Sequence, residues 1–245
     1  MKQTILITGG TGKIGRQLVK HFAQKGHMVV FTGRHKDRIA SLESECNNVV
    51  GICVDFSANT AIDTITGELS QRNLQVTSLI NCARDLDALR VEPDGSILSQ
   101  QWHAEYQIDV VVPYMLSMAL SKTGHLKRVV NIASMYGIQS FNPHLYDNDC
   151  NPALQYACAK AALIHLTKCL AVLLANKNIT VNCISYGGVE GRVSEAFKHR
   201  YAQLCPLKRM MTDIETIPAA DYLIDGGDNY ITGQNIVVDG GWGIW

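Results

Sequence analysis

The chain has 245 residues, 47% of them hydrophobic, which is enough for a large core, and we expect one domain spanning residues 1–245. Lys and Arg together number 22, as do Asp and Glu, so charge gives no reason to expect a nucleic acid or an anionic membrane as partner. The eight cysteines show no Cys-x-x-Cys pair or metal-ligand spacing, so a reducing cytoplasm is the simplest location and no metal is expected.

Neither a targeting segment nor a membrane span is expected. Residues Met1–Thr4 lead straight into an apolar run, which leaves no room for a signal peptide. The stretch Ala157–Ala175 is apolar but is interrupted by Lys160, His165 and Lys168, so it falls short of an uninterrupted span.

Short apolar runs alternate with longer helical patterns along the whole chain. The runs are mostly apolar on both faces, as strands covered by helices on two sides must be. Strands are expected at Ile5–Thr8, Met28–Thr32, Val49–Asp55, Ser78–Ala83, Arg128–Ser134, Thr180–Ser185 and Asn235–Asp239. Helices are expected near 13–25, 36–45, 58–72, 98–122, 153–176 and 213–225. This alternation predicts an α/β fold, a doubly wound Rossmann fold whose seven-stranded, mainly parallel sheet carries helices on both faces.

A glycine-rich turn, Thr8-Gly9-Gly10-Thr11-Gly12-Lys13-Ile14-Gly15, joins the first expected strand to the first expected helix. Glycines at this place permit a tight turn and close approach of the backbone to a pyrophosphate. The amino terminus of the helix adds unpaired N–H groups and a partial positive charge. We therefore expect a dinucleotide here, and a tight turn without a ligand is the alternative. The expected contacts are Gly9, Thr11, Gly12, Lys13, Ile14 and Gly15.

The end of the second strand favours NADP(H) over NAD(H). A cofactor with a free 2′-hydroxyl usually meets an acidic residue there. This strand instead ends Phe31-Thr32-Gly33-Arg34-His35, with no carboxylate before Asp37. Arg34 can bind a 2′-phosphate through two hydrogen bonds, and Lys13 adds a second cation. NADP(H) is the preferred cofactor and NAD(H) the second candidate; a solvated Arg34 is the other interpretation.

Tyr156 and Lys160 lie four residues apart, so a helix places them on one face. A free phenol titrates near ~10, so proton transfer near neutrality requires its pKa to fall by roughly 3, or about 4 kcal/mol. A neighbouring ammonium, with a hydrogen-bond donor such as Ser134 at the end of a strand, could supply this. On its own, the pair could equally be a surface or half-buried helix pair.

Taken together, the glycine turn, Ser134 and the Tyr156/Lys160 pair resemble the short-chain dehydrogenase/reductase family over essentially the full length. Further motifs fall in register with that family: Cys53-Val54-Asp55-Phe56, Asn81-Cys82-Ala83-Arg84, Asn131-Ile132-Ala133-Ser134, Ser185-Tyr186-Gly187-Gly188-Val189 and Thr232–Gly241. The resemblance implies an NAD(P)-dependent oxidoreductase that interconverts a carbonyl and an alcohol by hydride transfer.

The resemblance also implies roles for single residues. Tyr156 would exchange a proton with the substrate oxygen, Lys160 would lower the pKa of Tyr156 and hold the nicotinamide ribose, and Ser134 would bind the carbonyl or alcohol. Further cofactor contacts would come from Asp55, Phe56, Asn81, Ala83, Tyr186, Gly187 and Val189.

Several positions depart from the family pattern. Lys13 stands where compact members usually carry a glycine, and Tyr186 replaces a proline beside the nicotinamide. Asp109 occupies the place of a helix Asn that supports a water chain to the active Lys, so it is either part of the catalytic set or structural. Arg84 replaces a glycine. These departures leave open a catalytically impaired dinucleotide-binding sensor or scaffold.

The segment Phe141–Pro152, rich in Asn, Asp and Pro, lengthens the connection between Ser134 and Tyr156. With the ending Gly233–Trp242, it resembles members encoded for bacterial surface-glycan or flagellin-sugar synthesis. That implies carbohydrate biosynthesis, with a sugar or activated sugar as the small-molecule substrate; a solvated loop is the alternative. Reduction of a 3-oxoacyl carrier protein is the rival, against which the acidic residues of the segment argue. The expected sugar contacts are Asn142, His144, Tyr146, Asp147 and Asn148.

The helix expected to carry Tyr156 has more apolar positions than one buried face needs. They include Ile164, Leu166, Leu170, Val172, Leu173 and Leu174. Members of the family commonly pair this helix and the preceding long one across a twofold axis. A homodimer or homotetramer is therefore expected.

Overall fold

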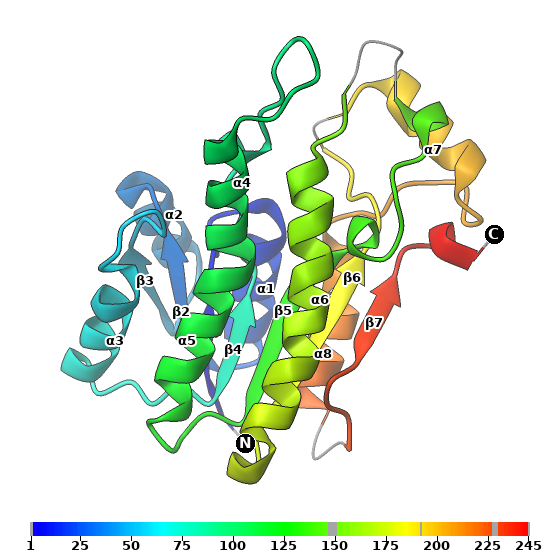
Figure 1. The fold of residues 1–245 in the computed structure, drawn as a ribbon. Coiled ribbons are helices and arrows are strands. Elements are labelled where there is room, and N and C mark those ends of the chain that lie inside the picture. The colour runs from blue at the N-terminus through cyan, green and yellow to red at the C-terminus, as the bar shows by residue number, and fades with distance from the viewer. Residues whose placement is uncertain (1, 147–150, 192, 227–229, 245) are drawn as a thin grey trace.

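The computed structural model describes residues 2–146, 151–191, 193–226 and 230–244 (Figure 1). Its centre is a seven-stranded sheet in the order β3-β2-β1-β4-β5-β6-β7, and every neighbouring pair is parallel. The doubly wound α/β prediction is confirmed. The strands are β1 (Thr4–Ile7), β2 (Met28–Gly33), β3 (Val49–Cys53), β4 (Ser78–Asn81), β5 (Arg128–Ser134), β6 (Thr180–Tyr186) and β7 (Asn235–Val238).

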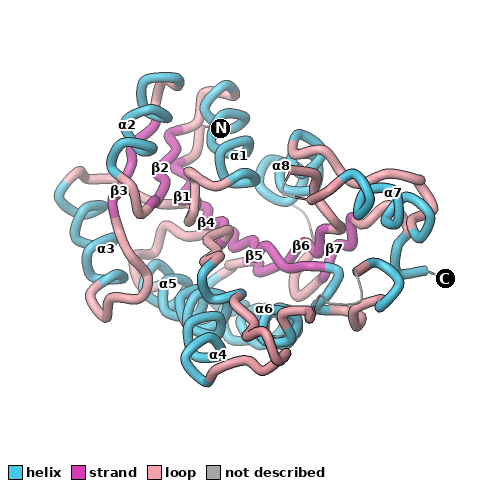
Figure 2. The backbone as a smooth tube through the Cα atoms, turned by 90° about the horizontal axis from the view of Figure 1, so that it is seen from above, coloured by secondary structure: helices cyan, strands magenta, loops and turns pink. Residues whose placement is uncertain are grey.

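Helices cover both faces of the sheet (Figure 2). One face carries α1 (Lys13–Gln24), α2 (Lys36–Glu45) and α8 (Ile217–Asp225). The other carries α3 (Ala61–Gln71), α4 (Ser99–Tyr106), α5 (Val112–Ser121) and α6 (Leu154–Leu174). A further helix, α7 (Glu195–Leu204), lies above the carboxyl ends of β6 and β7 (Figure 1).

Alternate strand residues feed two separate cores. In β1, Leu6 packs with α3, α5 and α6, whereas Ile5 and Ile7 pack with α1, α2 and α8. This is the two-sided burial that near-continuous apolar strands predict. From β1 the chain builds outward to β2 and β3 on one side and to β4 through β7 on the other. The carboxyl ends of β1 and β4 therefore form the switch point where such sheets bind ligands.

The long helix expected near 98–122 is interrupted by a π-helical turn, Gln107–Val111, between α4 and α5. Pro113 explains the interruption, because it has no N–H to donate to the carbonyl of Asp109 four residues earlier. Single π turns of this kind concentrate at functional sites. Here the turn carries Asp109, whose side chain is buried.

The helix α7 was not predicted from the sequence. It begins after Ser194, whose hydroxyl accepts a hydrogen bond from the Phe197 N–H at 3.2 Å. Its buried side packs on a separate cluster rather than on the sheet. That cluster consists of Met135, Leu145, Tyr201, Cys205, Met210 and Trp242.

Among the described residues, the segment Leu154–Lys177, which contains α6, is long and apolar enough to cross a membrane by length and composition. Its place in the fold gives those properties another cause. The helix packs against β5 and β6, where Leu163, Leu170 and Leu174 are buried, together with the polar Lys160.

Candidate active site

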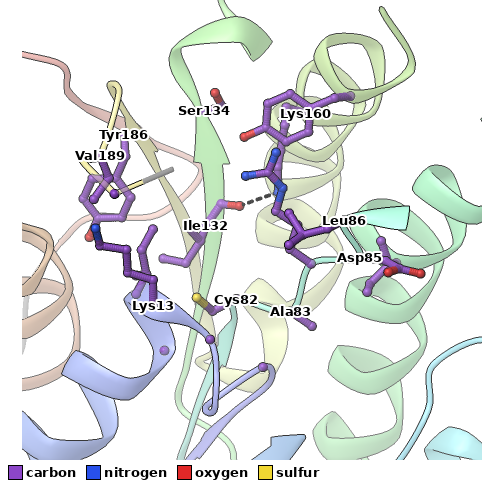
Figure 3. A pocket seen from close by; sticks show the side chains of 18 of the residues that line it. Lys13, Cys82, Ala83, Asp85, Leu86, Ile132, Ser134, Lys160, Tyr186 and Val189 are labelled. Atoms are coloured by element: carbon purple, nitrogen blue, oxygen red, sulfur yellow. Dashed lines mark hydrogen bonds between the residues drawn. The ribbon is translucent and has the colours of Figure 1, made fainter. Parts of the chain in front are cut away.

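A cleft of about 630 Å³ opens at the carboxyl ends of the central strands (Figure 3). The structure brings most of the predicted site residues together on its walls; the side chains of Asn81 and Asp109 lie behind them. The predicted residues that line the cleft are Gly9, Thr11, Gly12, Lys13, Ile14, Gly15, Arg34, Asp55, Phe56, Ala83, Ser134, Tyr156, Lys160, Tyr186, Gly187 and Val189.

The glycine turn forms the floor of the cleft. Gly9 has a φ of +68°, and a Cβ on it would lie 2.6 Å from the Ala83 Cα. A Cβ on Gly15 would lie 2.3 Å from the carbonyl oxygen of Gly9, so the turn closes only with glycine there. The hydroxyl of Thr8 accepts from the Cys82 and Ala83 N–H groups at 2.9 and 3.1 Å. The ends of β1 and β4 are thereby tied together beneath any ligand.

The amino terminus of α1 suits an anion. Gly12 caps the helix without a side-chain hydrogen bond, and the first turn holds no acidic residue. A Cβ on Gly191 would lie 2.4 Å from Lys13 Nζ, so the ammonium reaches across to the loop that follows β6. Figure 3 shows Lys13 on the same side as Tyr186 and Val189, opposite Lys160. Unpaired N–H groups, a cation and a floor without side chains fit a dinucleotide pyrophosphate.

The Arg34 guanidinium pairs with a carboxylate that sequence reasoning missed. Arg34 Nη1 lies 3.0 Å from Asp85 Oδ1, and the Arg34 side chain is 40% exposed. Asp85 follows β4, so the sheet brings close two residues that are far apart in the chain. Asp55 lies nearby, where the Ser57 backbone N–H lowers the pKa of its carboxyl against the effect of burial, with a further contribution from Arg34.

Ser134, Tyr156 and Lys160 converge at the other end of the cleft. Ser134 ends β5, and its Oγ accepts from the Tyr136 N–H at 3.2 Å. Lys160 Nζ lies 5.6 Å from the centre of the Tyr156 ring, as the helix spacing predicted. Arg84, to which the sequence assigned no role, places its guanidinium carbon 4.6 Å from the same ring centre.

The Lys160 ammonium is fixed from two sides. It donates to Asp109 Oδ1 at 2.8 Å. It also donates to the Ile132 carbonyl at 3.0 Å, the bond dashed in Figure 3. Burial opposes its charge, but the negative charge of Asp109 and the Tyr156 phenol outweigh this and raise the pKa of Lys160. The ammonium therefore stays charged beside the phenol.

Polar side chains behind the cleft hold β4, β5 and α6 in place. Asn81 donates to the Asn131 side chain at 2.8 Å, and Asn131 donates to Thr167 of α6 at 2.9 Å. This is where the structure places the predicted cofactor residue Asn81: buried, one layer behind the lining.

Tyr186 lines the cleft with a buried ring. Its hydroxyl donates to the Thr216 carbonyl on the α8 side of the sheet. Burial raises the pKa of Tyr186, with a smaller contribution from Cys82, so this phenol stays protonated. Tyr186 therefore acts as a wall rather than as a second acid–base group.

Aromatic and apolar side chains wall the cleft beyond Tyr156. The Tyr136 and Tyr146 hydroxyls lie 2.6 Å apart, and the rings of Tyr146 and Phe197 meet edge to face at 5.8 Å. Burial, and then Tyr146, raise the pKa of Tyr136, so the Tyr136 phenol stays uncharged. Only Tyr146 among these residues was predicted, because the others depend on α7 and the fold around it. The wall consists of Met135, Tyr136, Tyr146, Val193, Phe197, Tyr201 and Met210.

Of the predicted contacts in Phe141–Pro152 that the structure describes, one lies in the cleft. Tyr146 lines the cleft, whereas Asn142 and His144 line a separate hollow with Leu204 and Trp242. The remaining predicted contacts, Asp147 and Asn148, lie outside the described residues.

The chain matches known proteins over almost its whole length. Residues 3–202 match the family model described as short chain dehydrogenase. It is 21% identical to the post-translational flagellin modification protein A of Campylobacter coli, over 98% of both chains. It is 27% identical to a 3-oxoacyl-acyl-carrier-protein reductase of Thermotoga maritima, over 96% of both. The crystal structure of a short chain dehydrogenase from Leptospira borgpetersenii with bound NAD+ superposes with a TM-score of 0.88, at 28% identity over 99% of this chain and 93% of that one.

Proposed function

The chain belongs to the short-chain dehydrogenase family and is an NAD(P)-dependent oxidoreductase, and from this premise we propose that it prefers NADP(H) and uses Tyr156 as its acid–base group. The observation that carries the proposal is the convergence of Ser134, Tyr156 and Lys160 at one end of a cleft whose other end holds Arg34. That arrangement gives a site for proton transfer and a site for a dinucleotide in one continuous cavity.

A nicotinamide bound in this cleft would supply or accept the hydride at the substrate carbon. Tyr156 gives its proton to the carbonyl oxygen as the alcohol forms, and takes it back in the reverse direction. Ser134 holds the same oxygen by hydrogen bonding. Lys160 stabilises the phenolate of Tyr156, and its own position is fixed by Asp109 and the Ile132 carbonyl.

The preference for NADP(H) rests on Arg34. An exposed guanidinium at the end of β2 suits a 2′-phosphate. Asp85 is a competing partner, because its carboxylate pairs with Arg34. To bind Arg34 through two hydrogen bonds, a 2′-phosphate would have to replace the Asp85 carboxylate as the partner of at least one guanidinium N–H group.

The substrate that the cavity supports best is an uncharged ring bearing hydroxyl groups, such as a sugar or the sugar of an activated sugar. Ring faces stack on Tyr and Phe side chains, and the Tyr136/Tyr146 hydroxyl pair can exchange hydrogen bonds with a substrate hydroxyl. The relative named as a flagellin modification protein supports a role in surface carbohydrate synthesis.

Reduction of a 3-oxoacyl thioester is the second candidate. The apolar side chains of the same wall, Met135, Val193 and Met210, would accept an acyl chain, and one relative is named as a 3-oxoacyl-acyl-carrier-protein reductase. A panel of keto-sugars and ketoacyl thioesters assayed with NADPH separates the two. Tight NADPH binding without oxidation of NADPH across the whole panel would favour the sensor or scaffold instead.

The acid–base role is tested by Tyr156→Phe, which removes the transferable proton and keeps the ring. Turnover should fall by roughly 10²–10⁴-fold, while NADPH binding, followed by nucleotide fluorescence, should be unchanged. Tyr222→Phe is the matched control, because Tyr222 is an exposed tyrosine on α8. Turnover by Tyr156→Phe at the wild-type rate would refute the proposed mechanism.

The predicted assembly and location also stay proposals. A homodimer or homotetramer is supported by apolar side chains left exposed on neighbouring helices, Met115 on α5 and Leu173 on α6. A cytoplasmic location is supported by the seven cysteines among the described residues, all of which are free thiols.

A further inference from the structure

A seam of buried polar side chains runs between α4 and α6, behind the cleft. Gln101, Glu105 and Asp109 are spaced by four residues and are buried on α4 and the π turn, both of which pack against α6. Gln155 and Lys160 face them from α6. Glu105 is fully buried, and Asp109 is 2% exposed.

The seam has more acceptors than donors. Among the described residues, both Glu105 oxygens and Asp109 Oδ2 have no hydrogen-bond partner, and the same is true of the side-chain oxygens of Gln101 and Gln155. Lys160 donates to Asp109 Oδ1 and Ile132, and the Gln155 amide donates to the Ala88 and Arg90 carbonyls. A buried acceptor left without a donor is costly, more so for a charged one. The two carboxylates therefore need a proton between them.

The charges around Glu105 also indicate that this carboxyl group is protonated. From the elements packed against it, the charged groups are Lys160 of α6, Arg84 and the exposed Asp87 of the segment after β4, and Asp109 of its own helix. Only Lys160 is a buried cation, and it already pairs with Asp109. Burial, and then the charge of Asp109, raise the pKa of Glu105 to about 8, against the opposing effects of Lys160 and Arg84. Glu105 is thus a neutral acid at pH 7, able to donate to Asp109.

We propose that Glu105 is a positioning residue for the reaction proposed above: its protonated carboxyl group donates a hydrogen bond to the Asp109 carboxylate and thereby holds Asp109 on the Lys160 ammonium beneath Tyr156. The effect of Glu105 on turnover rests on the proposed function, whereas the protonation of Glu105 does not. When Glu105 loses its proton, it ceases to be a donor and becomes a second negative charge beside Lys160. That charge opposes the phenolate which Tyr156 forms as it gives its proton to the substrate.

The shared proton is tested without any turnover. A carboxyl group whose pKa is higher in the folded chain than in the unfolded chain destabilises the fold as pH rises. The loss of stability builds up between the pKa of the unfolded chain and the pKa of the folded chain. In urea titrations from pH 5 to 9, the unfolding midpoint of Glu105→Gln should therefore rise progressively relative to wild type. Parallel midpoints across this range would overturn the inference, because they mean that Glu105 is ionised throughout.

The positioning role is tested by the pH profile of turnover, with the carbonyl substrate that the panel identifies. Wild-type reduction should lose activity above pH about 8, and Glu105→Gln, which keeps a donor, should retain activity there. Glu105→Leu, which removes the donor, should lower kcat about tenfold with KM unchanged, corresponding to the ~1.4 kcal/mol of one hydrogen bond. Gln101→Leu, one turn away on the same buried face, is the matched control and should leave the profile unchanged.

The two hypotheses fail separately. A protein that turns over no carbonyl compound refutes the proposed function, while the urea comparison still decides whether Glu105 carries a proton. A Glu105→Gln profile identical to that of wild type overturns the positioning role, even if Tyr156→Phe is inactive.

Discussion

Arg34 has two possible anionic partners, a cofactor phosphate and the Asp85 carboxylate. Only the first favours NADP(H), and the second is present in the chain itself. Replacing Arg34 by Asp puts a carboxylate at the end of β2, which suits a free ribose 2′-hydroxyl and repels a 2′-phosphate.

Arg34→Asp should therefore weaken NADPH binding by roughly 10–100-fold, as expected for the loss of a charge-assisted hydrogen bond of about 1.5–3 kcal/mol, and should improve NADH binding. The ratio of kcat/KM for the two cofactors measures this directly. Lys36→Asp is the control, because it makes the same charge change two residues away, outside the cleft lining. If the ratio of kcat/KM for NADPH and NADH is unchanged in Arg34→Asp, Arg34 does not bind the 2′-phosphate.

Substitutions at Gly9 and Gly67 test whether the glycine turn requires a residue without a Cβ, with Gly67 of α3 as the comparison. Gly9→Ala meets the Ala83 backbone and a left-handed φ, so it should cost about 1–3 kcal/mol of unfolding free energy and abolish dinucleotide binding. Gly67 lies inside α3, with nothing within 4 Å of an added Cβ. Gly67→Ala should therefore stabilise the protein by about 0.5–1 kcal/mol. Urea unfolding measures both; a Gly9→Ala protein as stable as wild type would contradict the strain.

At the scale of elements, a charged cluster joins α1 to α8 on the side of the sheet away from Tyr156. Asp225 accepts hydrogen bonds from Gln3 Nε2 at 2.9 Å and from His27 Nε2 at 3.0 Å, and pairs with Lys25 at 2.6 Å. His27 Nδ1 accepts from the Gln3 N–H, so His27 Nε2 must carry the donated proton. Burial opposes the Asp225 charge, but Lys25 and His27 outweigh it and lower the pKa of Asp225.

A depressed carboxyl pKa stabilises the fold above the unfolded value of about 3.9, and that contribution is lost as pH falls through the folded value. Asp225→Asn should therefore lower the unfolding free energy by about 1–3 kcal/mol at pH 7. The difference from wild type should narrow as pH falls from 5 toward 3, which urea titrations at each pH would measure. A difference that stays constant over this range would contradict the assignment.

The strands were predictable because each is a short apolar run rich in β-branched residues, and the central ones are buried on both faces; all seven were found within a few residues. Two features of the helices were not predicted. The π turn follows from Pro113, because a proline inside an expected helix indicates an interruption there. The helix α7 packs through Tyr201 on Trp242 and on the segment after β5 rather than on the sheet, so its sequence lacks the regular apolar face that predicts a helix.

The same contrast holds for the site. The dinucleotide end was predictable because a local motif, Gly10-x-Gly12-x-x-Gly15, specifies it. Asp85 was missed because it pairs with Arg34, which is distant in sequence. Glu105 was missed because its burial arises only when α4 packs against α6. The aromatic wall was missed for the same reason, since it unites the segment after β5 with α7.

At the scale of the whole molecule, two helices leave apolar side chains uncovered. Val172 is 81% exposed and Leu173 is 52% exposed on α6, beside Met115 of α5. Exposed apolar side chains gathered on adjoining helices favour association with a second copy.

The wild-type protein should therefore sediment as a dimer or tetramer at micromolar concentration, and Val172→Glu should shift it toward smaller species by burying a charge in the interface. Lys36→Glu, at an exposed position of α2 on the opposite face of the sheet, is the control for the added carboxylate and should have the smaller effect. A monomeric wild-type protein would contradict the predicted assembly.

The separate cluster around α7 ties the last part of the chain to the substrate end of the cleft. The glycine turn and Arg34, at the proposed dinucleotide end, come from β1, β2 and the turns that follow them. The aromatic wall depends on Trp242, which follows the last strand and stacks on Tyr201 at 4.5 Å. Loss of the Trp242 ring should therefore loosen the wall around the proposed substrate and leave the glycine turn and Arg34 in place.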